Sequence, residues 1–151
     1  MITKLQLDPG AIAPHRAHAT DVGYDIRALH VDVAYKRVGA QNTIWKILID
    51  TGVHLTPPKG YYFELVPNSR LANTPFMYAN SIGIIDPSYT GSIKVALNAE
   101  YGLLNENAIP NPGDVVGQLI LRKQLSTSFA PVSSLTPTER GNGGFGSTAN
   151  R

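Results

Sequence analysis

The sequence contains no cysteine, and this absence excludes a disulfide framework, a thiol nucleophile and any cysteine-ligated zinc or iron–sulfur centre. It also contains no apolar run of about 18 residues, so no membrane-spanning helix is predicted. Residues 1–5 alternate between apolar and polar and lack the roughly 7–15-residue apolar core of a signal peptide. We therefore expect a protein that is not secreted and acts in the cytoplasm or nucleus, a description that includes a viral or phage protein inside a host cell.

Charge of either sign is sparse and evenly spread along the chain. There are 13 Lys and Arg against 11 Asp and Glu, a net charge of +2, and the basic residues never form a block. This pattern predicts no binding to nucleic acid or to a membrane surface. The four histidines lack the spacing of a zinc protease, and the sequence has neither a Walker P-loop nor a Gly-x-Ser-x-Gly elbow.

Short apolar segments separated by turn residues run through the 151-residue chain, which contains 14 Gly and 11 Pro. Apolar side chains fall mostly on alternate positions, as in half-buried strands, and helical periodicity is scarce. One short helical turn is predicted at 69–73, with Ser69 as its N-cap and Pro75 just after its end. The expected fold class is all-β, a barrel or jelly-roll-like sandwich. The predicted strands cover residues 2–7, 31–35, 43–49, 61–66, 93–97 and 115–121.

The composition changes near residue 125, where Ser, Thr, Pro and Gly begin to replace apolar residues. A segment this poor in apolar side chains cannot bury enough surface to fold as part of a core. We therefore expect one β domain at 1–125, followed by a flexible C-terminal arm at 126–151.

The arm carries a glycine-rich segment, 140–148, with a formal Gly-x-Gly-x-x-Gly match. A dinucleotide fingerprint needs a strand before it and a helix after it, and this context is not expected here, so the match does not predict a dinucleotide-binding fold. Glycine backbone amides, the hydroxyls of Ser147 and Thr148 and the Arg140 guanidinium nevertheless suit a phosphate group. Phe145 suits stacking on a nucleobase. The alternative interpretation is a disordered polar tail.

Residues 80–97 predict a β-hairpin, with a strand, a Pro-Ser turn and a second strand. Gly83 permits a ligand to approach the backbone closely. Asp86, next to the turn, is placed to hold or deprotonate a water molecule, whereas turn capping is the alternative for an Asp before Pro. Tyr89 taken alone predicts packing.

Three further segments contain polar side chains at suggestive positions. Asp25 begins a strand and suits a cation or metal-bound water, although a solvated edge charge explains it equally well. Ser69 and Arg70 open the helical turn and suit an anion, with a plain N-cap as the alternative. Gln118 enters an apolar strand, where a satisfied core amide is the alternative.

Taken together and in this order, the five segments resemble the five motifs of the trimeric dUTPase family. The closest matches are Gly23-Tyr24-Asp25-Ile26, residues 80–86 with Tyr89 and Gly91, and Arg-Gly-x-Gly-Gly-Phe-Gly-Ser-Thr at 140–148. The resemblance implies a β-clip, jelly-roll-like subunit that forms a homotrimer. It also implies three active sites at subunit junctions, each covered by the C-terminal arm of a neighbouring chain.

The resemblance further implies hydrolysis of dUTP to dUMP and pyrophosphate by attack of water on the α-phosphorus, with Mg²⁺ bound across the triphosphate. Such an activity limits uracil in DNA and supplies dUMP for thymidylate synthesis. Asp86 is then the residue that activates the water, and Asp25 lies near the water shell of the metal, contacting it only indirectly.

The same resemblance assigns substrate contacts to residues of all five motifs. Asn80 and the backbone of 83–85 read the uracil, and Tyr89 packs on the deoxyribose. Ser69 and Gln118 donate to the phosphates, Phe145 stacks on uracil, and Arg140 with 147–148 holds the γ-phosphate. The complete substrate-binding set is Ser69, Arg70, Asn80, Gly83, Ile84, Ile85, Tyr89, Gln118, Arg140, Phe145, Gly146, Ser147 and Thr148.

Two motifs depart from the family pattern. Asn68 stands where a phosphate-binding Arg is expected, and Arg70 replaces the usual Gly or Ser. Val115 replaces an Arg and Gly117 an Ala in the fourth motif, and we expect these two changes to be structural.

Two alternative functions follow from these residues. The segment 85–91 also resembles the dCTP deaminase family, but Ala96 stands where that family has its glutamate, so deamination is disfavoured. A non-catalytic dUTP-binding regulatory protein on the same fold is the other alternative, and Asn68 is the residue that keeps it open.

Overall fold

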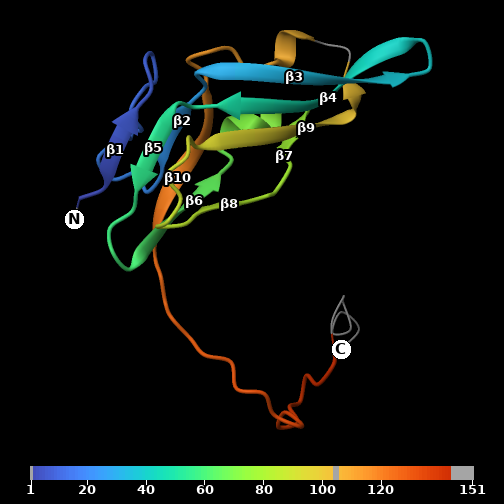
Figure 1. Ribbon diagram of the computed structural model, residues 1–151. Coiled ribbons are helices and arrows are strands. Elements are labelled where there is room, and N and C mark those ends of the chain that lie inside the picture. Colours follow the sequence, from blue (N-terminus) through green and yellow to red (C-terminus); the bar gives the residue numbers. More distant parts are fainter. Residues whose placement is uncertain (1, 104–105, 144–151) are drawn as a thin grey trace.

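The computed structural model describes residues 2–103 and 106–143. Its strands form two four-stranded sheets and one two-stranded sheet, and the paired strands are antiparallel (Figure 1). The expectation of an all-β, jelly-roll-like fold is confirmed. In chain order the elements are β1 (Lys4–Leu7), β2 (Tyr24–Arg27), β3 (His30–Val38), β4 (Gln41–Asp50), β5 (Val53–Thr56), β6 (Tyr61–Val66), η1 (Ser69–Asn73), β7 (Phe76–Tyr78), β8 (Gly83–Ile85), β9 (Lys94–Leu103), η2 (Glu106–Ala108) and β10 (Val115–Lys123).

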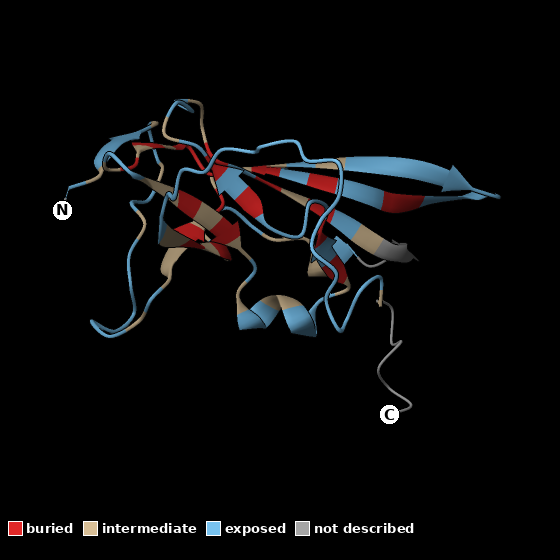
Figure 2. Cartoon of the chain, turned by 90° about the horizontal axis from the view of Figure 1, so that it is seen from below, coloured by how far each residue is buried: buried red, intermediate tan, exposed pale blue. Residues whose placement is uncertain are grey.

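The two larger sheets share one apolar core. Their strand orders are β2-β10-β6-β8 and β3-β4-β9-β7, while β1 pairs with β5. Residues at alternate positions of both sheets, such as Ile47 and Ile49 on β4 and Leu119 on β10, are almost fully buried and belong to one cluster (Figure 2). Burying a side chain of this size contributes roughly 1.5–3 kcal/mol. The core therefore fixes the strand ends from which the loops of the candidate site extend.

Each predicted strand overlaps an observed one, and the predicted helical turn is present as the 3₁₀ helix η1. The N-cap prediction is wrong by one residue: Asn68 occupies the N-cap, and no side chain caps the turn. Asn68 is the N-cap because its carbonyl accepts the first hydrogen bond of the turn, from the backbone N–H of Leu71 at 3.1 Å. Ser69 is therefore left exposed.

The predicted hairpin at 80–97 is also wrong. β8 pairs with β6, whereas β9 pairs with β4 and β7, so the two strands lie in different sheets. The backbone N–H of Ile93 donates to Val53 O at 2.9 Å, and its carbonyl accepts from Thr51 N at 3.1 Å. These bonds bring the chain to the end of β4 before β9 begins. The connection is a crossover between sheets, residues 86–92, which we call the Tyr89 loop.

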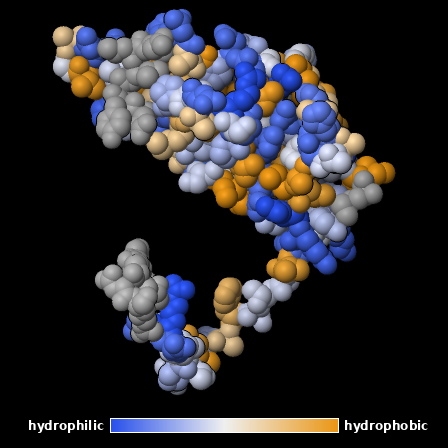
Figure 3. Space-filling view, turned by 180° about the vertical axis from the view of Figure 1, so that it is seen from behind, coloured by the Kyte–Doolittle hydropathy of each residue, from blue (hydrophilic) through white to orange (hydrophobic). Residues whose placement is uncertain are grey.

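After β10 the chain leaves the body as an extended arm (Figure 1). The backbone N–H of Gln124 still donates to Gly60 O at 2.8 Å. Beyond it, apolar side chains such as Phe129 and Leu135 lie exposed, and apolar surface also interrupts the hydrophilic surface of the body (Figure 3). Among the described residues, no helix is long and apolar enough to cross a bilayer.

Candidate active site

Three residues of the first and fourth motifs meet on β10, on β2 and just before β2. Gln118 on β10 lies opposite Asp25 on β2, and its Nε2 donates to Asp25 Oδ1 at 3.0 Å. Gly23 makes room for this amide, because a Cβ at Gly23 would lie only 2.7 Å from Gln118 Oε1. The other neighbour of Gln118 is Val66 on β6. This half-buried Gly23–Asp25–Gln118 cluster joins the two motifs in space.

The second motif continues from the same edge of the sheet, since Ser69 follows Val66 by three residues. Ser69 and Arg70 are exposed at the start of η1. Arg70, Asn68 and Val115 line one hollow of about 450 Å³ between η1, η2 and the start of β10. Within residues 2–103 and 106–143 the Arg70 guanidinium has no hydrogen bond or ion pair, so its charge is available to an anion.

β8 is an edge strand whose outer side pairs with no other described strand. In an antiparallel pair, alternate residues turn both backbone groups away from the partner strand. Backbone donors and acceptors of 83–85 are therefore open to a ligand. A Cβ at the buried Gly83 would lie 3.3 Å from Leu65 Cβ and 3.5 Å from Asn80 Nδ2, so the amide of Asn80 lies beside this open edge.

Asp86 follows β8 directly and is exposed. Its carbonyl accepts from the backbone N–H of Tyr89 at 3.0 Å, which forms a tight turn. With Tyr62, Ile84 and other neighbours it lines a shallow hollow of about 250 Å³. No hydrogen bond or ion pair engages its carboxylate in the part of the chain that the structure describes, so it is free to accept a proton from water.

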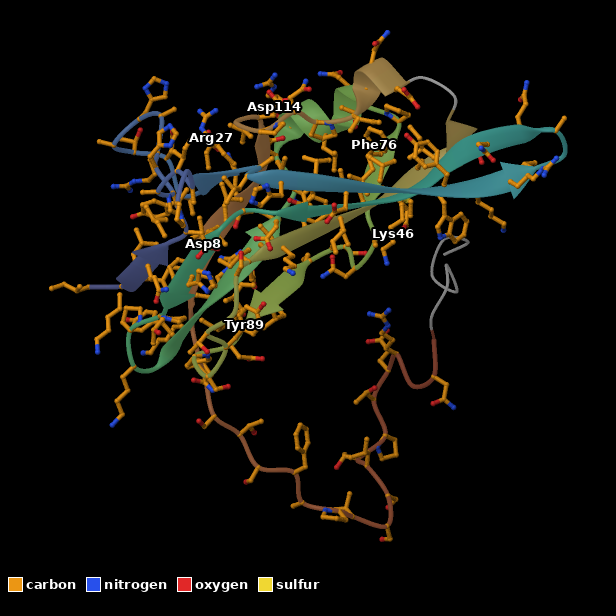
Figure 4. All side chains as sticks on the ribbon, turned by 45° about the horizontal axis from the view of Figure 1, so that its top comes forward. Asp8, Arg27, Lys46, Phe76, Tyr89 and Asp114 are labelled. Carbon is orange, nitrogen blue, oxygen red and sulfur yellow. The ribbon has the colours of Figure 1, made fainter. Side chains whose placement is uncertain are left out.

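The Tyr89 loop is closed on itself beyond Asp86. Tyr89 Oη donates to Ser92 O at 2.8 Å, and a Cβ at Gly91 would lie only 2.6 Å from this hydroxyl. Figure 4 labels Tyr89 on this loop. Ser92 Oγ in turn donates to Asp50 Oδ1. Tyr89 is 42% exposed, so part of its surface is available for packing on a ligand.

The dUTPase family model matches residues 10–149, nearly the whole chain. The chain belongs to the dUTPase family. It is 34% identical over 145 residues to the deoxyuridine 5'-triphosphate nucleotidohydrolase of Paramecium bursaria Chlorella virus 1, covering 95% of this chain and 94% of that protein.

Solved dUTPase structures share the fold. A mutant dUTPase of Staphylococcus bacteriophage 80alpha, solved with dUpNHpp, superposes with a TM-score of 0.76 at 21% identity, over 97% of this chain and 98% of that chain. A mutant dUTPase from phage phi11 of S. aureus, solved to describe coordination of a structural Mg(II) ion, has a TM-score of 0.71 at 22% identity, over 91% of this chain and all of that chain.

Ser69 and Asp86 lie toward opposite ends of one strand pair. β6 and β8 run antiparallel, so Ser69 follows one end of the pair and Asp86 the other. Asp86 lies three residues, or about 10 Å of extended chain, beyond Gly83. Arg140 lies on the arm, where its Nε donates to Gly143 O at 3.1 Å. Phe145, Gly146, Ser147 and Thr148 lie outside the described residues.

Two buried or half-buried groups beside the dUTPase motifs were not predicted from sequence. Tyr78 Oη donates to Val116 O at 2.6 Å, and a Cβ at Gly117 would collide with this hydroxyl. Burial raises the pKa of Tyr78, so the phenol stays protonated and remains a donor. Gly117 therefore has the structural role expected of it.

The second group is His54, which contacts the Tyr89 loop. Its Nδ1 lies 2.9 Å from Thr90 O and its Nε2 lies 3.2 Å from Asp8 Oδ1. The hydrogen bond to the Thr90 carbonyl, followed by the bond to Asp8, raises the pKa of His54. No sequence signal identifies this residue, because its partners are 36 and 46 positions away.

Proposed function

We propose that this chain hydrolyses dUTP to dUMP and pyrophosphate. The observation that carries the proposal is the family match over residues 10–149. In the reaction, a water oxygen bonds to the α-phosphorus, the bond from that phosphorus to the α–β bridging oxygen breaks, and pyrophosphate leaves. Asp86 accepts the proton of the attacking water, a role supported by its exposed carboxylate and its lack of a described partner.

The open edge of β8 supports recognition of the base. Uracil presents an N–H between two carbonyl oxygens, and a strand edge presents donors and acceptors at fixed spacing. Backbone groups of 83–85 and the Asn80 amide would pair with this pattern, which cytosine does not match. A polar site built to pair with one hydrogen-bond pattern rejects another strongly because its own groups are then left unpaired.

The phosphates would lie at the other end of the sheet. Ser69 and the Gln118 amide supply neutral donors, and Arg70 supplies a cation. Arg70 lines the same hollow as Asn68 and Val115, the two positions where the expected arginines are missing. This arrangement supports a compensating role for Arg70 toward the triphosphate.

Mg²⁺ fits this arrangement as a partner of the substrate. Across the described residues no group of three or more His, Asp or Glu side chains gathers to hold a metal. Mg²⁺ commonly binds proteins through one or two carboxylates, substrate phosphates and retained waters. Half-buried Asp25, with one oxygen bonded to Gln118, suits contact through such a water. When bound, Mg²⁺ would neutralise charge on the triphosphate.

The assembly proposed is a homotrimer with sites at subunit junctions. It is supported by the separation of Asp86 from the Gly23–Asp25–Gln118 cluster within one chain. The arm at 126–151 would close each site, with Arg140, Ser147 and Thr148 on the γ-phosphate and Phe145 with Gly146 over the uracil. Closure would exclude water other than the nucleophile.

Purified protein with Mg²⁺ should release pyrophosphate from dUTP and not from dCTP, dTTP or UTP at comparable rates. Loss of ammonia from dCTP would indicate the deaminase instead. Tight dUTP binding with no pyrophosphate release would indicate the regulatory protein, and reversion of Asn68 to Arg would then be the next step.

A further inference from the structure

His54 joins two segments that are distant in the sequence. It lies on β5, opposite Gln6 of β1. One ring nitrogen faces the Thr90 carbonyl of the Tyr89 loop and the other faces the Asp8 carboxylate after β1. The ring is thus a bridge between the N-terminal segment and the loop.

Both groups that face the ring are hydrogen-bond acceptors. A neutral imidazole has one N–H and one bare lone pair, so it can satisfy only one of two acceptors. The imidazolium has an N–H on each nitrogen and satisfies both. The geometry therefore favours protonation of the ring, and the two hydrogen bonds raise the pKa of His54.

The charges around the ring favour the same form. Asp8 contacts it directly, and Asp50 at the end of β4 adds a second negative charge. Lys4 on β1 lines the same shallow groove as His54 and Thr90. Lys94 at the start of β9 lies 3.4 Å from Asp50, which it partly neutralises.

The Tyr89 loop has few other attachments to the body. Its closing bonds, from Tyr89 N to Asp86 O and from Tyr89 Oη to Ser92 O, are internal. Ser92 binds Asp50 at its far end, and His54 binds Thr90 next to the tyrosine. The bond from His54 is the described attachment closest in sequence to Tyr89.

We propose that the His54 imidazolium is a positioning residue that fixes the Tyr89 ring against the sugar of the nucleotide and so sets discrimination between dUTP and UTP. This inference rests on the proposed function, in which Tyr89 packs on the deoxyribose. A ring held firmly leaves no room for a 2′-hydroxyl, whereas a ring that can move back admits it.

The test compares kcat/KM for dUTP and UTP in wild type, His54→Ala and His54→Asn between pH 6 and 9. Asparagine keeps an N–H on the atom bonded to Cγ, where histidine has Nδ1, but carries no charge. We expect His54→Ala to lower the dUTP/UTP ratio about tenfold and His54→Asn to restore most of it. The ratio should fall in wild type as the pH rises through the His54 pKa, because the one proton of the neutral ring then goes to Nε2 and the Asp8 carboxylate, the stronger acceptor, and the Thr90 carbonyl loses its donor. It should stay flat in His54→Asn, whose amide does not ionise. Because both substrates share the chemistry of Asp86, its ionisation cancels in the ratio.

His30→Ala is the matched control, because His30 is exposed on β3 and its ring has no hydrogen bond or ion pair in the described residues. A wild-type ratio in His54→Ala at every pH would overturn the inference. Hydrogen exchange of the amides at 88–92 provides a readout that needs no turnover: it should accelerate in His54→Ala and not in His30→Ala. Unchanged hydrogen exchange at 88–92 in His54→Ala overturns the inference even if the protein hydrolyses no nucleotide. Faster exchange together with no hydrolysis of dUTP would support the hold of His54 on the Tyr89 loop and reject the proposed function.

Discussion

Gln118 Nε2 donates to Asp25 Oδ1 at 3.0 Å across β10 and β2, while Asp86 stands beyond the far end of β8 in the same sheet. The bond leaves one Asp25 oxygen and one Gln118 N–H for a ligand. In the proposed trimer, the phosphate-binding residues and the Asp86 of one chain would therefore serve two different active sites.

Mixing two inactive variants tests this separation. We expect Asp86→Asn and Gln118→Ala each to hydrolyse dUTP poorly alone. After co-expression in equal amounts and random assembly, about a quarter of all sites should combine an intact Asp86 from one chain with an intact Gln118 from another. We expect pyrophosphate release to recover toward that fraction of the wild-type rate. No recovery would mean that both residues serve the same site from a single chain.

Tyr78 and Gly117 should be energetically coupled, because the tyrosine hydroxyl occupies the space of a Cβ at 117. Gly117→Ala should cost about 1–3 kcal/mol of unfolding free energy through overpacking. Tyr78→Phe should cost about 1 kcal/mol by leaving the Val116 carbonyl unpaired. In the Tyr78→Phe background, Gly117→Ala should lower the unfolding free energy by clearly less. Urea unfolding at one protein concentration measures wild type and the three variants, and equal costs of Gly117→Ala in the two backgrounds would contradict the packing argument.

Arg70 should carry part of the phosphate binding. Arg70→Ala should lower kcat/KM for dUTP by about 10–100-fold, since a charge-assisted contact to the transition state is lost. Adding Asn68→Arg to that variant should restore part of the loss, because position 68 lines the same hollow. Arg37→Ala is the control, with its guanidinium bonded to Gly39 O on an exposed hairpin. Unchanged kinetics in Arg70→Ala would remove Arg70 from the site.

Acid stability should depend on Asp50. Desolvation alone raises its pKa, but hydrogen bonds from Ser92, Gly52 and Lys94 lower the pKa of Asp50 overall. A carboxyl with a lowered folded pKa stabilises the protein above its unfolded value of about 3.9, and this contribution is lost as the pH falls through the folded pKa. The unfolding free energy of wild type should therefore fall more steeply below about pH 4 than that of Asp50→Asn. If the unfolding free energies of wild type and Asp50→Asn fall in parallel with pH, these hydrogen bonds do not favour the ionised carboxylate over the protonated one.

Much of the fold was predictable from alternation, because each sheet has a buried face and the period of a strand is two. β5 and β7, which contain four and three residues, were not predicted. The hairpin prediction failed because a local Pro-Ser turn says nothing about which sheet the next strand joins. That choice is made by the bonds of Ile93 to residues some 40 positions earlier.

The site was predictable only in part. The sequence alone indicated three polar residues at turns or in strands: Asp25, Asp86 and Gln118. Their roles came only from the resemblance to the dUTPase family. The contact between Gln118 and Asp25 spans 93 positions and depends on strand register. His54 could not be predicted, because both of its ring partners come from distant segments.

The position of bond cleavage tests the central claim most directly. Hydrolysis of dUTP in ¹⁸O-labelled water, with Mg²⁺ and wild-type protein, should place the label in dUMP and none in pyrophosphate, and Asp86→Asn should bind dUTP while turnover falls by about 10²–10⁴-fold. Label in pyrophosphate, or full turnover by Asp86→Asn, would contradict attack at the α-phosphorus by water that Asp86 activates.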